Sequence, residues 1–496
     1  MTEFELKFEI PPARLKSVAV AVLEGKANRE RLQASYFDTP DGVLARHGIV
    51  VRLRKEGRRW VQTTKGPTAD MLERLEHNVT LAPQRAGVVP ALDLSRHRGT
   101  PVGKAIDKAL GLRGDQSAPS LELLYGTDIQ RISRQVAHGG SVVELALDQG
   151  RVFANGHSQS ICELEVELKE GSPLDAVALA RQWCAAHGLW ISTIAKSMKG
   201  QRLRQAEPFG EAISAVAPEY APLVTAHDMM SAVVLTCLGQ ILPNASELAN
   251  GSQNPDHVHQ LRVGIRRLRT ALRELAGLTD AIDPAWEDAL VHAFRALGAH
   301  RDQSYLALVF QPQLLAAGGP AIDFKDTQGK PPDAGETVRA PDFQTALLGL
   351  LGFVQREAVD EAQKPADLKK AVAARLDKLH KRALRDGKKF LALSQEQQHD
   401  VRKRLKRLRY LIELTAPLFT NGKRKRMANA LKPVQEALGL YNDEFMALQA
   451  WRAMLPDEPN AWFGIGWLMA RKQPNAKRCL KEIKAFADIP PFWRVT

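Results

Sequence analysis

The N-terminal segment of the chain alternates apolar and charged residues with a period of two. Its charged positions include Glu3, Glu5, Lys7 and Glu9. Successive side chains of a β-strand point to opposite faces, so the alternation predicts a strand with these charges on one face. Hard divalent cations prefer carboxylate oxygens, and lysine is a common partner of phosphate. The segment is therefore a candidate for binding a metal ion beside a phosphate group.

Two further segments predict strands of the same kind. In residues 161–171 the glutamates Glu163, Glu165 and Glu167 share one face, and in residues 49–57 Arg52 and Arg54 share one face. Taken alone, a strand with charges on one face is most simply a solvated edge of a sheet. Acidic and basic strands in one short region instead favour a closed barrel, whose lumen would hold both signs of charge. Each sign would then offset the cost of burying the other.

These segments belong to an ordered series that resembles the CYTH domain, the triphosphate tunnel metalloenzyme family. The resemblance covers about residues 1–205 and implies an α+β domain built on a closed antiparallel β-barrel that forms a triphosphate tunnel. The series consists of Glu3-x-Glu5-x-Lys7, Tyr36-Phe37-Asp38-Thr39, Arg52-x-Arg54, Thr63-x-Lys65, Arg74-x-Glu76, Thr127-Asp128-x-x-Arg131, Glu144 with Asp148, Glu163-x-Glu165-x-Glu167, and Lys196 with Gly200.

The resemblance implies two sets of site residues. Phosphate hydrolysis depends mostly on positioning and on offsetting charge, so cations would grip the phosphate chain and carboxylates would hold one or two Mg²⁺ or Mn²⁺ ions. The catalytic basic set is Lys7, Arg52, Arg54, Lys65, Arg74, Arg131 and Lys196. The metal-binding set is Glu3, Glu5, Glu163, Glu165, Glu167 and Asp148.

Several nearby polar residues are assigned other roles. Arg131 and Arg134 fall on opposite faces of one strand, and the motif favours Arg131 as the inward residue. Asp38 is expected to be a turn residue and not a ligand. Neither His77 nor His97 has a partner residue at the spacing of a motif, and both are predicted to be surface or structural residues.

The second part of the chain repeats a basic helical pattern. His259-x-x-Arg262-x-x-x-Arg266-Arg267-Leu268-Arg269 recurs as His399-x-x-Arg402-x-x-x-Lys406-Arg407-Leu408-Arg409. Apolar residues at helical spacing predict a core-facing stripe beside the basic one. Like charges at this spacing repel, so the basic stripe indicates a bound anion, although a solvated face is the simpler reading for a single helix. Duplication favours two related helices that line one groove.

The repeated pattern resembles the CHAD domain, an all-α module of two similar halves, over about residues 222–496. The resemblance implies that inorganic polyphosphate binds to the helical domain. The predicted ranges are a tunnel domain at 1–205, a linker at 206–221, and a helical domain at 222–496 with halves 222–315 and 342–496 joined by a loop at 316–341. The matching positions are His259, Arg262, Arg266, Arg269, His399, Arg402, Lys406 and Arg409.

Composition restricts the partners and the compartment. The net charge of +13 favours an anionic partner. The four cysteines are scattered without a C-x-x-C pair, which predicts reduced residues in a cytoplasmic protein, with association with polyphosphate granules as a further expectation. The longest apolar stretches are too short to span a bilayer, so no membrane partner is expected. An aromatic content of 6% makes nucleic acid a poor candidate, because single-strand binding uses stacking residues.

The sequence predicts a multidomain enzyme that hydrolyses inorganic triphosphate to pyrophosphate and phosphate. One alternative is a non-catalytic polyphosphate-binding or granule-associated protein. Another is a member of the same family that acts on a nucleoside triphosphate, as class IV adenylate cyclases do, or on thiamine triphosphate. The chain has no Gly-x-x-x-x-Gly-Lys loop and no HExxH helix, so the usual nucleotide-hydrolase and protease interpretations have no support.

Overall fold

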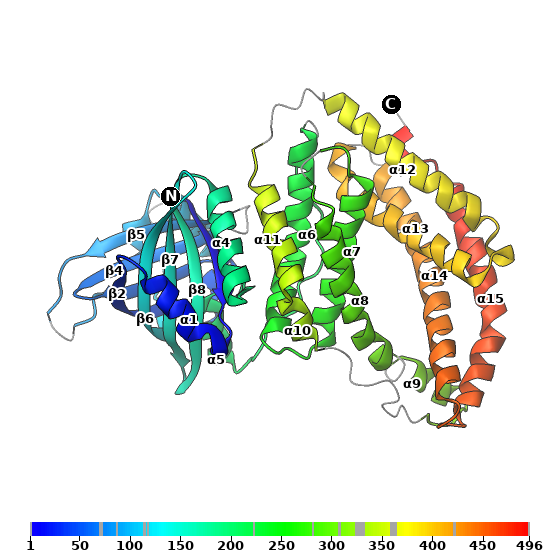
Figure 1. Cartoon of the computed structure of the whole chain (residues 1–496), viewed down its shortest axis with the longest axis horizontal. Helices are drawn as coiled ribbons and strands as arrows, with labels where there is room; N and C mark the ends of the chain where they lie inside the picture. Colours follow the sequence, from blue (N-terminus) through cyan, green and yellow to red (C-terminus); the bar gives the residue numbers. More distant parts are fainter. Residues whose placement is uncertain are drawn as a thin grey trace. The chain divides into compact units, whose positions relative to one another are not determined.

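The chain forms two compact units (Figure 1). The computed structural model describes residues 2–68, 73–85, 88–112, 116, 119–221, 224–279, 282–305, 309–322, 333–357, 365–419 and 423–494. The first unit, called the barrel unit below, comprises Met1–Ile213, Leu242–Ser252 and Val338–Arg356. The second, called the helical unit, comprises Ser214–Ile241, Gln253–Thr337 and Glu357–Thr496.

A closed antiparallel sheet forms the centre of the barrel unit. Its strands are β1 (Thr2–Glu9), β2 (Asn28–Asp38), β3 (Val50–Glu56), β4 (Arg59–Pro67), β5 (Glu73–Leu81), β6 (Glu122–His138), β7 (Ser141–Ala154) and β8 (His157–Glu170). They are ordered β5-β4-β3-β2-β6-β7-β8-β1, and pairing of β1 with β5 closes the ring. The short strand β9 (Trp190–Ile191) pairs with the end of β1. The predicted closed barrel is confirmed.

The alternation within β1 explains its two faces. Phe4, Leu6 and Phe8 are at most 5% exposed, while the charged residues between them are only partly buried.

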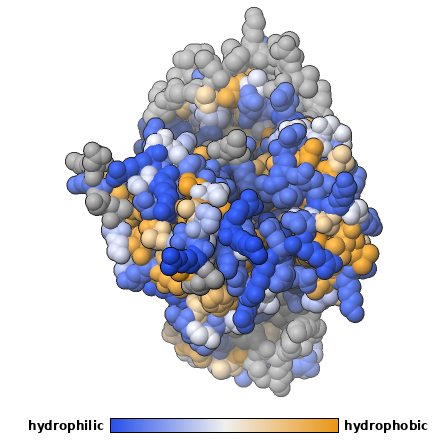
Figure 2. Space-filling model, turned by 90° about the vertical axis from the view of Figure 1, so that its left-hand side faces the viewer, coloured by the Kyte–Doolittle hydropathy of each residue, from blue (hydrophilic) through white to orange (hydrophobic). Residues whose placement is uncertain are grey.

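Hydrophilic residues cover most of the coloured surface on the side of the molecule shown in Figure 2. The helices of the N-terminal segment are α1 (Leu15–Leu23), α2 (Val43–Arg46), α3 (Pro101–Ala109), α4 (Pro173–His187) and α5 (Lys196–Gln205).

Asp38 is a structural residue, as its sequence context predicts. Its carboxylate accepts hydrogen bonds from the backbone N–H groups of Thr39 at 2.7 Å, Leu44 at 2.9 Å and Ala45 at 2.9 Å. These bonds satisfy donors of the first turn of α2, which otherwise have no partner within the helix. Asp38 therefore organises the turn after β2 and does not face the lumen.

The rest of the chain is helical. Its helices are α6 (Ala226–Ala249), α7 (Pro255–Glu274), α8 (Ala285–Tyr305), α9 (Gln311–Ala316), α10 (Ala334–Arg339), α11 (Pro341–Val354), α12 (Pro365–Gly387), α13 (Gln395–Leu414), α14 (Lys423–Met454) and α15 (Ala461–Ala487). In the helical unit α7 packs against α8 and α13, and α14 packs against α15. Leu261, Ile265 and Leu268 of α7 are fully buried, as the predicted apolar stripe requires.

Part of the predicted 316–341 loop is helical and not irregular, because α10 lies within it. Residues 323–332 of that loop lie outside the described residues. The domain ranges themselves stay a prediction. Among the described residues, α6 is long and apolar enough to span a membrane, so the expectation that the apolar stretches are too short is wrong for this helix, and 67% of the qualifying window is buried within the structure.

Candidate active site in the barrel lumen

The lumen of the barrel contains a cavity of about 670 Å³. Inward-facing residues of the strands and the start of α5 form its wall. Every residue of the predicted catalytic and metal-binding sets lines this cavity, although the role of each stays a prediction. These residues are Glu3, Glu5, Lys7, Arg52, Arg54, Lys65, Arg74, Arg131, Asp148, Glu163, Glu165, Glu167 and Lys196.

One cluster of acids in the lumen has the geometry of a metal site. Asp148 of β7 and Glu163 and Glu165 of β8 each offer an oxygen atom, and these atoms all lie within 4.8 Å of one another. Asp148 and Glu163 are completely buried. Three carboxylates are a suitable donor set for a hard divalent cation. We call these three residues the acidic triad.

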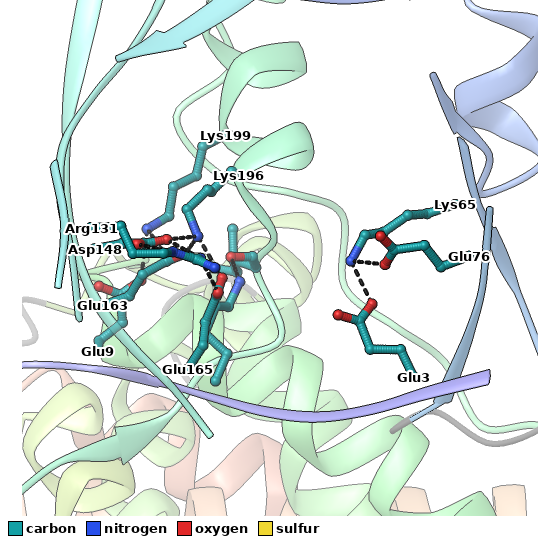
Figure 3. A network of polar contacts seen from close by, with 12 residues as sticks. Glu3, Glu9, Lys65, Glu76, Arg131, Asp148, Glu163, Glu165, Lys196 and Lys199 are labelled. Carbon is teal, nitrogen blue, oxygen red and sulfur yellow. Dashed lines mark hydrogen bonds and ion pairs between the residues drawn. The ribbon is translucent and has the colours of Figure 1, made fainter. Parts of the chain in front are cut away.

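Two cations hold the acidic triad together (Figure 3). The Arg131 guanidinium donates from Nε to Asp148 Oδ1 at 2.7 Å and from Nη2 to Asp148 Oδ2 at 2.6 Å, and it also contacts Glu165. Lys196 Nζ lies 2.7 Å from Asp148 Oδ2 and 2.5 Å from Glu165 Oε1, and it contacts Glu163. Arg131 and Lys196 thus offset part of the negative charge of the triad, and both could themselves bind phosphate oxygens.

The same cations keep the triad glutamates ionised. Burial alone would raise the pKa of Glu163, but the charges of Lys196, Lys7 and Lys199 outweigh it and lower that pKa to about 2. Burial is likewise outweighed at Glu165, where Arg131 and Lys196 hold the pKa well below its usual range. A carboxyl group must be deprotonated before it can bind a metal. Glu163 and Glu165 therefore meet this requirement near neutral pH.

A second acidic cluster lies across the lumen. Lys65 Nζ is 2.6 Å from Glu3 Oε2 and 2.7 Å from Glu76 Oε2 (Figure 3). Burial and a hydrogen bond with Glu76 raise the pKa of Glu3 to about 8. Burial would also raise the pKa of Glu76, but its bond with Glu3 and the charge of Lys65 lower it. The two neighbouring carboxyl groups beside Lys65 thus have pKa values shifted in opposite directions.

The remaining predicted acids are not members of the acidic triad, although Glu5 lies near enough to Glu165 for its charge to act on it. Burial and the charge of Glu165 raise the pKa of Glu5. Glu167 contacts Lys169 Nζ at 2.6 Å, and Lys169 also lies 3.2 Å from Glu144. Of the six predicted metal ligands, the structure brings Asp148, Glu163 and Glu165 into one compact group and leaves the others elsewhere on the wall.

The basic residues come from several strands. Arg54 Nε donates to Glu56 Oε1 at 2.7 Å, and the side chain of Arg52 interacts with Tyr36. Arg74 is the cross-strand partner of Glu3. Arg131 faces the lumen as the motif indicates, while Arg134 Nη1 donates to the backbone oxygen of Glu24. Cations therefore surround the cavity from different directions.

Two members of this network were missed by the sequence reasoning. Lys199 Nζ lies 2.7 Å from Glu9 Oε1 and 3.3 Å from Glu163 Oε2. Glu9 has the same parity in β1 as Glu3, Glu5 and Lys7, and the sequence placed it on their face without assigning it to either site set. Lys199 follows Lys196 by one turn of α5, and helical neighbours at this spacing share a face. Both signals were present in the sequence.

The basic stripe of α7 lies against α8. The guanidinium of Arg262 is 4.4 Å from the centre of the Phe294 ring, and Arg262 Nη1 donates to the backbone oxygen of Phe294 at 3.0 Å. Arg266 and Arg269 lie 5.1 Å and 5.8 Å from the same ring centre. Arg269 Nη2 forms an ion pair with Glu287 Oε1 at 3.4 Å. Phe294 was not predicted, and His259 is exposed on the same helix.

The second copy of the stripe, on α13, has different partners. His399 Nδ1 is 2.8 Å from Asn442 Oδ1, and Arg409 lies 2.6 Å from Glu413 and 2.7 Å from Gln435. Arg402 and Lys406 are partly buried on the same helix. Because α7 packs against α13, the two copies are adjacent. The structure thus brings the duplicated helices together, while their role in binding stays a prediction.

Comparisons with known families match two successive parts of the chain. The model of the CYTH domain matches residues 1–200, and the model of the CHAD domain matches residues 232–452. The inorganic triphosphatase of Haemophilus influenzae is 28% identical over 174 residues, which cover 34% of this chain. The matched region spans 45% of the length of that relative.

Solved structures with similar folds cover each part separately. The CHAD domain from the plant Ricinus communis shares 22% identity and a TM-score of 0.46, covering 57% of this chain and 98% of that one. A candidate adenylyl cyclase from Hippeastrum, described as having a dominant triphosphatase activity, shares 16% identity and a TM-score of 0.29. It covers 41% of this chain and 96% of its own.

Proposed function

Because the chain carries a CYTH domain followed by a CHAD domain, we propose that it hydrolyses inorganic triphosphate to pyrophosphate and phosphate in the barrel lumen. The observation that carries the proposal is the enclosed wall on which the acidic triad and cations from several strands meet. Triphosphate is small and densely charged, and a cavity of about 670 Å³ with many cations suits such a ligand. Phosphate hydrolysis also depends mostly on electrostatics and positioning.

The proposed cofactor is Mg²⁺ or Mn²⁺, held by Asp148, Glu163 and Glu165. A bound ion of this kind polarises phosphoryl oxygens and lowers the pKa of a bound water. Arg131 and Lys196 contact the same carboxylates and are placed to bind phosphate oxygens next to the ion. Lys65, Arg52 and the other cations of the wall would bind the remainder of the phosphate chain.

The composition of the wall favours inorganic triphosphate over a nucleotide. Tyr36 is the aromatic residue among the described residues that line the cavity. Recognition of a nucleobase commonly uses stacking side chains and a mainly apolar pocket. Charged side chains dominate this wall instead, which supports a substrate made of phosphate groups alone.

The proposed partner of the helical unit is long-chain polyphosphate. The basic stripes of α7 and α13 lie on packed neighbouring helices, so one polyanion could contact both. The cytoplasmic location proposed for the protein is supported by free cysteines, of which Cys184, Cys237 and Cys479 are buried. Association with polyphosphate granules would follow from polyphosphate binding.

The test is a substrate panel with the full chain. Phosphate release from inorganic triphosphate, ATP and thiamine triphosphate is measured with Mg²⁺, with Mn²⁺ and with a chelator. We expect kcat/KM to be highest for inorganic triphosphate and turnover to stop when the metal is removed. A folded protein that releases no phosphate with either metal would overturn the proposal and favour the non-catalytic polyphosphate-binding protein.

A further inference from the structure

A short loop, residues 192–195, connects β9 to α5 and borders the active site. Ser192 N donates to the backbone oxygen of Lys7 at 2.9 Å, and Lys7 Nζ donates to the backbone oxygen of Ile194. Lys196, which contacts the acidic triad, follows the loop as the first residue of α5. The position of this loop therefore affects two of the lumen lysines.

The C-terminal half of α6 holds this loop from another direction. Thr193 N donates to Ser246 Oγ at 3.0 Å, and Ser246 Oγ donates to the backbone oxygen of Leu242 at 2.8 Å. Leu242 and Pro243 also line the cavity. These residues belong to the barrel unit by their contacts, although they lie in the part of the sequence that matches the CHAD domain.

An ion pair between α5 and α6 holds the C-terminal end of α5. Arg202 Nη1 lies 3.2 Å from Glu247 Oε2, and Arg202 Nη2 contacts Glu247 Oε1. Glu247 is only 4% exposed. Gly210 passes over the pair so closely that a Cβ atom there would be 3.1 Å from Glu247 Oε1. Two parallel bonds from one guanidinium fix orientation as well as distance.

We propose that Glu247 and Ser246 are positioning residues for the lumen site. Glu247 acts through Arg202 on the orientation of α5, and Ser246 acts through Thr193 on the loop before it. Together they set where the ammonium groups of Lys196 and Lys7 lie relative to the acidic triad. This inference rests on the proposed function for the identity of the reaction. It extends the set of residues that shape the site into the segment that matches the CHAD domain.

The test compares Glu247→Gln and Ser246→Ala with a matched control in the helical unit. Glu444 of α14 is 5% exposed, and its Oε1 atom forms an ion pair with Nε of Arg471 of α15 at 2.7 Å. Glu444→Gln therefore removes a similarly buried charge away from the lumen. For each full-length variant, Mn²⁺ affinity is measured by electron paramagnetic resonance, kcat and KM are measured with triphosphate, and the melting temperature is recorded.

We expect Glu247→Gln to weaken Mn²⁺ binding and to lower kcat, each by roughly tenfold or more, because small displacements of positioned groups have large effects. Ser246→Ala should act in the same direction with a smaller effect. Glu444→Gln should lower the melting temperature as Glu247→Gln does, but leave Mn²⁺ affinity and kcat near those of the unchanged protein.

Equal effects of Glu247→Gln and Glu444→Gln on Mn²⁺ affinity and kcat would overturn the inference, because both pairs would then contribute stability alone. If Glu247→Gln does not fold, Ser246→Ala decides, and an unchanged Mn²⁺ affinity overturns the inference. A wild-type chain without triphosphatase activity would contradict the proposed function, while the Mn²⁺ titrations would still decide whether these residues position the site.

Discussion

The barrel lumen and the basic stripe of α7 both concentrate charge, but they balance it in different ways. In the lumen, the completely buried carboxylate of Asp148 is held by Arg131 and Lys196. On α7, Arg262 lies over the ring of Phe294 and donates a hydrogen bond to the backbone oxygen of that residue. A cation over a ring is stabilised without a negative charge. An enclosed site thus supplies its own counter-charges, while a partly exposed helix can keep a surplus of cations for a long anion.

The largest effect should come from removing one charge of the lumen. Asp148→Asn removes one negative charge of the acidic triad and leaves Glu165 as the remaining acid that Arg131 and Lys196 share. We expect kcat for triphosphate to fall about 100-fold or more, which is the scale seen when one electrostatic group of an active site is lost. Polyphosphate binding by the helical unit should not change. Phosphate-release kinetics and a filter-binding assay measure the two activities.

The barrel provides a matched control for this substitution. Asp128 and Arg31 form an ion pair outside the lumen with the same two distances, 2.7 Å and 2.6 Å, as Asp148 and Arg131. Asp128→Asn should leave kcat unchanged and cost about 1 kcal/mol or less, because the Arg31 side chain is 55% exposed. If both variants lose activity equally, the enclosed position of Asp148 is not what matters.

A smaller effect is expected from reversing charge on the duplicated helices. Arg266→Glu combined with Lys406→Glu changes equivalent positions of α7 and α13. Polyphosphate affinity should fall at least tenfold at low salt and show a weaker dependence on salt, because fewer counterions are then released on binding. Triphosphate hydrolysis should continue. Titration of a fluorescent long-chain polyphosphate at several salt concentrations measures the change.

The control for this variant has the same change in net charge. Lys381→Glu combined with Arg385→Glu reverses two residues of α12 whose side chains are 68% and 72% exposed. Polyphosphate affinity should change much less in this variant. Equal losses in the two double variants would mean that the helical unit attracts polyphosphate through net charge and has no defined groove.

The smallest effect tests how tightly the first basic stripe is packed. Leu297-Gly298 of α8 and Leu438-Gly439 of α14 are each followed by an aspartate four residues after the glycine, so the two glycines occupy corresponding positions of the two repeats. A Cβ atom at Gly298 would lie 2.8 Å from Arg262 Nη1, while a Cβ atom at Gly439 would meet nothing within 4 Å. Gly439→Ala should stabilise the fold by about 0.5–1 kcal/mol. Gly298→Ala should gain less, because Arg262 must move away from Phe294.

Chemical denaturation of the two alanine variants measures this difference. The same titration with polyphosphate shows whether the position of Arg262 affects binding. Equal gains in stability would indicate that Arg262 moves freely and that the contact with Phe294 does not hold it in place. The two repeats would then differ less than their side-chain contacts indicate.

Local periodicity was sufficient to predict which face of a strand carries the site. The parity of Glu163, Glu165 and Glu167 placed all three on the wall of the lumen. Periodicity could not predict that Glu167 lies outside the acidic triad, because its contact with Lys169 depends on the side-chain conformations within the closed barrel. The motif resemblance supplied the barrel itself, since alternation alone also fits an open sheet.

Contacts between distant residues could not be predicted from local patterns. Lys199 and Glu9 are adjacent in space but belong to α5 and β1, and Glu247 meets Arg202 only after two helices have packed. The rings of His77 and His97 also meet, with their Nδ1 atoms 2.9 Å apart, although no spacing in the sequence indicated a pair. His97 is fully buried, which supports the structural role predicted for it.

The period-two arrangement of β1 has a consequence for how this segment can change over time. Glu3, Glu5 and Lys7 reach the lumen because each is separated from the next by one buried apolar residue. A single inserted or deleted residue would exchange the two faces of every position beyond it. Related lineages could therefore replace individual residues here, but a change in length within β1 would place phenylalanine among the charged groups of the lumen and glutamate in the core.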